Sequence, residues 1–177
     1  MSHIRPVDPA TAAPAVAQTL AAVKARIGMV PNLFATLAQA PAVLDAYLKF
    51  SDALASGRLT ARQREIIALA VGQANACQYC LSAHTLMARG AGLDADAVDR
   101  ARRGEADDAL DNALAGFARQ LASERGRASS ADIDALRRAG VDDGLIIEVI
   151  AQVALNTLTN YTNHVAATDI DFPLVSL

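Results

Sequence analysis

Long segments rich in alanine and leucine, bounded by glycine or proline, run through most of this 177-residue sequence. Hydrophobic residues make up 53% of the chain and aromatic residues only 4%, so its core must be built mainly from small side chains. Small side chains suit closely packed helices, whereas strands favour β-branched and aromatic residues. No alternating strand pattern competes with the helical one. The sequence therefore predicts an all-α protein, as a single domain of residues 1–177.

Helix start and stop signals divide the chain into successive helical segments. Pro41 can begin a long segment that ends near Gly57, since proline suits the first helical position and glycine the end. Thr60 and Gln63 have the spacing of a capping box, in which each side chain binds a free backbone amide of the other residue. An apolar run follows directly. We therefore expect another long helix to begin at Thr60.

A four-residue pattern recurs in the chain at an offset of 83 residues. The first copy is Gly57, Glu65, Cys77 and Cys80, and the second is Gly140, Glu148, Asn160 and Asn163. We interpret this as a degenerate internal repeat of helical hairpins, packed about a pseudo-twofold axis; coincidence is the alternative. In the second copy amides replace the thiols. We accordingly expect Asn160 and Asn163 to make structural contacts, and we assign them no chemistry.

Four residues between positions 65 and 84 form the candidate reactive site: Glu65, Cys77, Cys80 and His84. Cys77 and Cys80 are the only cysteines in the chain, and two thiols at this spacing form the usual unit of thiol redox exchange. His84 lies four residues after Cys80 and seven after Cys77, so one helix would place all three side chains along one stripe. Glu65 belongs to the preceding apolar segment and can enter the same pocket from a second helix.

The residue types suggest a specific chemistry. With Asn75 as N-cap, both cysteines would lie in the first turns of a helix, where free amides and the helix dipole favour a thiolate. His84 can take the proton of Cys80, and the Glu65 carboxylate can fix the imidazole tautomer. The Cys80 thiolate can attack the O–O bond of a hydroperoxide, and Cys77 can convert the resulting sulfenic acid to a disulfide.

The spacing Glu-x11-Cys-x-x-Cys-x3-His on an internally duplicated helical chain resembles the alkyl hydroperoxidase D-like branch of the carboxymuconolactone decarboxylase superfamily. The segment Val30-Pro31-Asn32-Leu33-Phe34 and the tail ending in Asp171-Phe172-Pro173 look like its uncharacterised peroxidase-related subgroup. The resemblance implies the same single helical domain. It also implies that Cys80 attacks the peroxide, that Cys77 resolves the intermediate, and that His84 and Glu65 relay protons.

By the same resemblance, the protein is expected to be a thiol-dependent alkyl hydroperoxidase or disulfide oxidoreductase with an antioxidant role. The expected partners are a hydroperoxide substrate, a thiol or dithiol electron donor of unknown identity, and further copies of the chain in a homo-oligomer, a trimer or hexamer. No cofactor is implied. Tyr79 stands where the founding enzyme has a further histidine, so one relay member is missing. We expect Tyr79 and Tyr161 to line the pocket.

Three other interpretations compete with a peroxidase. A structural zinc site needs four ligands, whereas this motif offers three and no second Cys/His pair exists, so no metal is expected. A non-enzymatic redox sensor or partner-binding protein would use the same thiols without turnover. A lactone decarboxylase is disfavoured, because true members of that group lack the paired cysteines.

Charge and segment composition limit the partners and the location. A net charge of −3 and a pI near 5.5 give no basic field, so nucleic acid is not an expected partner. The N-terminus lacks the layout of a signal peptide, and no apolar run is long enough to span a bilayer. We therefore expect a cytoplasmic protein with no membrane partner. In a reducing compartment, a Cys-x-x-Cys pair is catalytic, redox-sensing or metal-binding.

Overall fold

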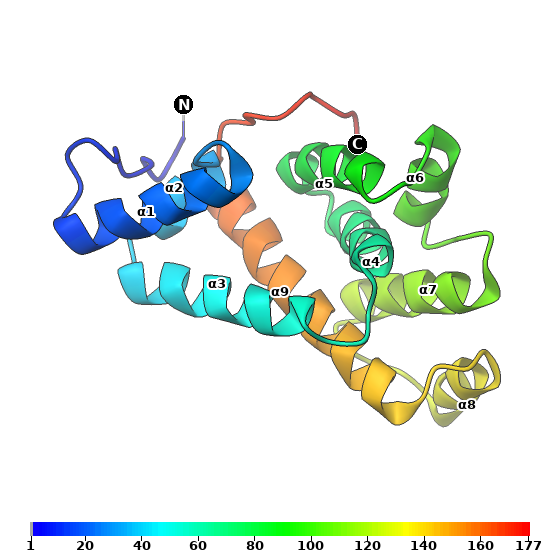
Figure 1. Ribbon diagram of the computed structural model, residues 1–177. Coiled ribbons are helices and arrows are strands. Elements are labelled where there is room, and N and C mark those ends of the chain that lie inside the picture. Colours follow the sequence, from blue (N-terminus) through cyan, green and yellow to red (C-terminus); the bar gives the residue numbers. More distant parts are fainter. Residues whose placement is uncertain (1) are drawn as a thin grey trace.

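The computed structural model of the protein describes residues 2–177, and no strand occurs among them. The helices in this range are α1 (Pro14–Ile27), α2 (Asn32–Leu37), α3 (Pro41–Ala55), α4 (Ala61–Ala74), α5 (Gln78–Gly90), α6 (Ala95–Arg102), α7 (Ala109–Ser123), α8 (Ser130–Arg138) and α9 (Asp143–Ala166). They form one helical domain (Figure 1). The predicted all-α class is confirmed.

Helix α4 lies at the centre of the molecule, in contact with α5, α6, α7 and α9. Its residues 66–72 are all buried, as expected for a helix that is apolar on every face. It begins at the predicted capping box. The Thr60 hydroxyl accepts a hydrogen bond from the Gln63 amide at 3.2 Å, and the Gln63 side-chain oxygen accepts one from the Thr60 amide at 3.0 Å.

The long helix α9 runs diagonally between two groups of helices (Figure 1), with α1, α2 and α3 on one side and α4 to α7 on the other. A cluster of buried side chains joins the first group to the start of α5. It contains Leu33 and Leu44 together with Cys77, Tyr79 and Cys80. The two thiols therefore lie in the core between the N-terminal helices and α5.

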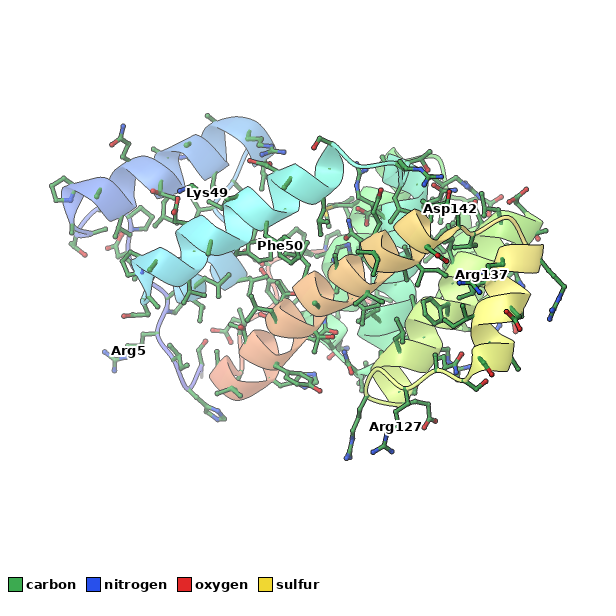
Figure 2. The ribbon with its side chains drawn as sticks, turned by 90° about the horizontal axis from the view of Figure 1, so that it is seen from below. Arg5, Lys49, Phe50, Arg127, Arg137 and Asp142 are labelled. Atoms are coloured by element: carbon green, nitrogen blue, oxygen red, sulfur yellow. The ribbon has the colours of Figure 1, made fainter. Side chains whose placement is uncertain are left out.

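The N-terminus of α9 is fixed to the loop before α4. Asp142 caps α9 by accepting the Leu145 amide at 2.9 Å, and it also binds the Arg58 guanidinium at 2.8 Å. The Glu148 carboxylate accepts both backbone amides of Arg58 and Leu59, at 2.9 and 3.1 Å. Figure 2 shows Asp142 at the end of the molecule where α8 leads into α9. These bonds set the position of α9 relative to α4.

The internal repeat is only half present in the structure. The 83-residue offset relates the start of α4 at Ala61 to Gly144, one residue into α9, but the predicted second hairpin is wrong. The first copy turns at Ala76, where a positive φ of 51° redirects the chain, whereas Thr159 at the matching position lies within the uninterrupted α9. Because this turn is missing, Asn160 and Asn163 continue the helix that corresponds to α4.

Candidate active site

A sharp turn between α4 and α5 places the two cysteines. Asn75 caps the C-terminus of α4, and Ala76 then adopts a left-handed conformation. The N-cap of α5 is Cys77, whose sulfur accepts the Cys80 backbone amide at 3.4 Å. The prediction that Asn75 is the N-cap is therefore wrong by two residues, because the chain needs Ala76 to reverse direction. Cys80 still lies in the first turn of α5, close to its free amides.

The two sulfurs are adjacent, buried and unbonded. They lie 2.6 Å apart, and Cys77 and Cys80 are only 1% and 3% exposed. Donating a hydrogen bond to Cys80 raises the pKa of Cys77, and burial raises it further. Accepting that bond lowers the pKa of Cys80 against the opposing effect of burial, and His84 lowers it further. The pair is thus asymmetric, with Cys80 as the thiol that ionises first.

Glu65 and His84 form a hydrogen-bonded pair between two helices. His84 Nδ1 lies 2.8 Å from Glu65 Oε2, and about a fifth of each side chain is exposed, 20% and 18%. Burial would lower the pKa of His84, but Glu65 and Cys80 outweigh it and raise that pKa. The structure therefore joins Glu65 from α4 to His84 from α5, as the sequence spacing predicts.

A cavity of about 800 Å³ opens beside these residues, lined by α1, α2, α3, α4, α5 and α9 and by parts of the connecting segments. Cys80, Glu65 and His84 all line it, and Cys77 does not. The lining also includes the apolar side chains of Val23, Ile27, Leu33, Phe34 and Leu48 and the phenol of Tyr47. Three of the four predicted site residues thus face a common space, and the fourth lies behind Cys80.

Asn163 contacts the thiols, and sequence reasoning missed this role. Its side-chain Nδ2 donates to Cys80 Sγ at 3.3 Å and lies 4.0 Å from Cys77 Sγ. Asn160, one turn away, is fully buried and accepts a hydrogen bond from Asn75 Nδ2 at 2.8 Å. A signal was available: five of the positions between 152 and 163 of an otherwise apolar helix are polar and buried. Those positions are Gln152, Asn156, Thr159, Asn160 and Asn163.

The Tyr79 hydroxyl is hydrogen-bonded to two other segments of the chain. Its ring lines the cavity, as predicted, but its hydroxyl donates to Asp171 Oδ1 at 2.8 Å and accepts the Leu33 amide at 3.1 Å. The ring also packs edge-on against Phe172 at 5.6 Å. Burial raises the pKa of Tyr79. Its hydroxyl is thus committed to holding α2 and the C-terminal tail against α5.

Tyr161 and the other two histidines lie away from the cavity. Tyr161 is 58% exposed and does not line it, so that prediction is wrong. His164 is exposed and lies 3.3 Å from the Ala76 carbonyl, and His3 contacts the Val165 carbonyl. Within residues 2–177, no group of three or more His, Cys, Asp or Glu side chains could hold a metal ion. In the same range, no helix is both long enough and apolar enough to cross a bilayer.

Known proteins share sequence features with this chain. Residues 41–124 match the model of the carboxymuconolactone decarboxylase family. An alkyl hydroperoxide reductase of Mycobacterium tuberculosis is 32% identical over 93 residues, which are 52% of this chain and 27% of that protein. The chain therefore spans about a quarter of the length of this curated relative.

Solved structures extend the similarity to nearly the whole chain. An uncharacterised peroxidase-related protein from Ralstonia eutropha JMP134, described as an alkylhydroperoxidase AhpD core, is 28% identical with a TM-score of 0.86. The match covers 96% of this chain and 92% of that one. A debrominase in complex with 2,3,4-tribromopyrrole shares the fold at a TM-score of 0.81, with 19% identity over 97% of this chain and 92% of its own. Residues 41–124 thus match the carboxymuconolactone decarboxylase family, and nearly the whole chain is similar in fold and sequence to the alkylhydroperoxidase AhpD core protein.

Proposed function

We propose that the protein is a thiol-dependent peroxidase that reduces organic hydroperoxides and uses Cys80 as the attacking thiol. The observation that carries this proposal is the order of the two sulfurs relative to the cavity. Cys80 lines it, and Cys77 lies directly behind, 2.6 Å away. A substrate in the cavity therefore meets Cys80 first, and Cys77 is in place to attack the sulfur of Cys80 afterwards.

The reaction has two steps at the cysteine pair. The Cys80 thiolate attacks the terminal oxygen of the hydroperoxide; an S–O bond forms, the O–O bond breaks, and the organic part leaves as an alcohol after taking a proton. Cys77 then attacks the Cys80 sulfur, forming a disulfide and releasing water. An external thiol or dithiol returns the pair to the reduced state. In sum, one hydroperoxide and two external thiols give one alcohol, one water and one disulfide.

Glu65 and His84 would serve as the proton relay for the first step. A protonated imidazole near the sulfur favours the thiolate, and Glu65 and Cys80 raise the pKa of His84 against the effect of burial, which favours that protonated form. The 2.8 Å bond to Glu65 fixes the ring and stabilises its positive charge. In this proposal neither residue bonds covalently to the substrate.

The size and lining of the cavity favour an organic substrate. About 800 Å³ is far more space than hydrogen peroxide requires, and the wall from α1 to α3 is mostly apolar. Apolar residues of α1, α2 and α3 would hold the organic group while its –OOH end lies at Cys80. The alkyl hydroperoxide reductase of M. tuberculosis agrees with this substrate class.

We also propose that the protein self-associates. Large apolar side chains of α9 are exposed along one stripe: Ile147, Ile150, Leu158, Tyr161 and Val165, with exposures of 43–66%. Helix α3 lies beside α9 on the face shown in Figure 2 and adds Phe50, which is 40% exposed. An apolar surface of this kind is typical of a subunit interface. Light scattering on the wild type and on Val165→Asp would test it; equal masses corresponding to one chain would contradict it.

Turnover separates this enzyme from a redox sensor that uses the same thiols. With a dithiol donor and cumene hydroperoxide, the wild type should consume many equivalents of peroxide per protein molecule. Cys80→Ser should consume none above the protein-free rate. Consumption that stops after one equivalent, although the dithiol still reduces the disulfide, would favour the sensor and contradict a peroxidase. No observation on this chain favours decarboxylation.

A further inference from the structure

One asparagine side chain of α9 contacts the reactive sulfur, and a second lies on the same face of that helix. Asn163 Nδ2 donates to Cys80 Sγ at 3.3 Å, in a site where Asn163 is 5% exposed. Asn160 lies three residues earlier on the same helix face and is fully buried. Neither residue lines the cavity, whereas Cys80 does. The Asn163 amide therefore reaches the sulfur without occupying the cavity.

The orientation of the Asn160 amide is fixed by a third asparagine. Asn75, in the turn before Cys77, donates its Nδ2 to Asn160 Oδ1 at 2.8 Å. This leaves the Nδ2 group of Asn160 buried without a hydrogen-bond partner, and Asn163 Oδ1 is also buried and unpaired. A buried donor without a partner is costly, so its retention beside a thiol requires an explanation. A negatively charged sulfur provides one.

An amide donor distinguishes the two ionisation states of a thiol. A neutral S–H group is a weak acceptor, whereas a thiolate accepts strong, charge-assisted hydrogen bonds. A donor held against the sulfur therefore stabilises the thiolate more than the thiol. Cys80 receives the Asn163 bond at 3.3 Å, while Cys77 lies at 4.0 Å, the outer limit for sulfur. The same two amides lower the pKa of Cys80.

We propose that Asn163 and Asn160 form an anion-binding site for the Cys80 thiolate and thereby determine which of the two cysteines is the nucleophile. The Cys80 proton goes to the imidazole of His84, and the charge left on sulfur is held by amide N–H groups of α9. This replaces the purely structural role expected from the repeat. The 83-residue offset aligns Asn160 and Asn163 with the two cysteines in sequence. In space, Asn163 instead donates a hydrogen bond to Cys80. Both are positioning residues, since they act through Cys80.

The test uses single-cysteine proteins that carry Cys77→Ser, whose hydroxyl can still donate to Cys80. The rate of alkylation of Cys80 by iodoacetamide is measured from pH 4 to pH 10. Asn163→Asp preserves size and removes the donor, and Asn163→Leu removes it without adding charge. We expect both to move the midpoint to higher pH by about one unit or more, and so to slow alkylation about tenfold or more at pH values below both midpoints, the cost of a hydrogen bond to a charged group. Asn163→Asp should have the larger effect.

Thr162→Val is the matched control. Thr162 is the neighbour of Asn163, its hydroxyl binds the Leu158 carbonyl within α9, and it does not line the cavity. We expect the pH midpoint of Cys80 alkylation to be the same in Thr162→Val as in the parent protein. If the Asn163 variants keep the wild-type midpoint while their thermal stability falls, the amides are structural and the inference is wrong. Equal midpoint shifts in Thr162→Val would contradict it as well.

Asn75→Ala provides a second variant that leaves both amides of α9 in place. It frees Asn160 to rotate, so we expect the pH midpoint of Cys80 alkylation to rise by less than in the Asn163 variants. An unchanged midpoint would show that Asn160 does not help to bind the thiolate. The inference rests on the proposed function only for the use of the thiolate. A low midpoint that depends on Asn163, in a protein that never reacts with hydroperoxides, would uphold the anion site and refute the peroxidase.

Discussion

His84 Nδ1 lies 2.8 Å from Glu65 Oε2, and this single bond connects α4 to α5 beside the Cys80 sulfur. The two residues are 19 positions apart in the chain and arrive from different helices. Glu65 supports the charge on His84, and that charge in turn lowers the pKa of Cys80. The effect of the carboxylate on the thiol therefore passes through the imidazole.

We predict that Glu65 and His84 act as one unit. In the Cys77→Ser protein, Glu65→Gln and His84→Gln should each raise the pH midpoint of Cys80 alkylation by about one unit, which slows alkylation about tenfold at pH values below both midpoints. The double variant should be little worse than the more damaging single one. If the factor by which the double variant slows alkylation equals the product of the two single factors, Glu65 and His84 act independently. Glu148→Gln, at the corresponding position in α9, is the control and should leave the alkylation rate unchanged.

The pH dependence of the wild type should have a definite direction. Because the folded protein lowers the pKa of Cys80, the thiolate should persist below the ordinary thiol value of about 8.5. Alkylation should be almost maximal at pH 8 and should fall as acid protonates Cys80. Cys77→Ala removes the hydrogen bond that contributes most to this shift, so its midpoint should lie higher than that of Cys77→Ser. A lower midpoint in Cys77→Ala would contradict the assignment.

Glu148 should stabilise the fold and leave the thiols unaffected. Glu148→Ala leaves the backbone amides of Arg58 and Leu59 without their acceptor. We expect the free energy of unfolding to fall by about 1–3 kcal/mol. Gly57→Ala should act at the same place, since its Cβ would lie 2.6 Å from Glu148 Oε2 and displace the carboxylate. Urea denaturation measures both; if Gly57→Ala destabilises a Glu148→Ala protein as much as the wild type, the two effects are unrelated.

Tyr79 should also act on stability and not on proton transfer. Tyr79→Phe keeps the ring in the core but removes the bonds to Asp171 and to the Leu33 amide. We expect a loss of about 1–3 kcal/mol in unfolding free energy. The pH midpoint of Cys80 alkylation should stay at the wild-type value. A midpoint shift larger than that of His84→Gln would mean that Tyr79 replaces the missing relay histidine after all.

Local spacing predicted the parts of the site that depend on one or two neighbouring helices. Helix geometry places His84, four residues after Cys80, one turn along the same helix face, and it allows the capping box at Thr60. Both features are present. The start of α5 was misplaced, because the left-handed conformation of Ala76 carries no sequence signature. Alanine at that position gave no reason to expect a turn.

The contact between α9 and the thiols could not be derived from local patterns. Asn163 and Cys80 are 83 residues apart, and only the packing of α9 against α5 brings them together. The same 83-residue offset had suggested equivalence between these residues. That equivalence does not hold in space, since α9 continues as a helix where the first copy turns.

The central claim is that Cys80 takes the oxygen of a hydroperoxide and Cys77 resolves the product. Mass spectrometry after one equivalent of cumene hydroperoxide tests it most directly. The wild type should lose two hydrogens and yield a peptide cross-linked between Cys77 and Cys80. The Cys77→Ser protein should gain one oxygen on Cys80, which dimedone then traps. Oxidation of Cys77 in Cys80→Ser at the wild-type rate, or no oxygen on Cys80 in Cys77→Ser, would contradict the account.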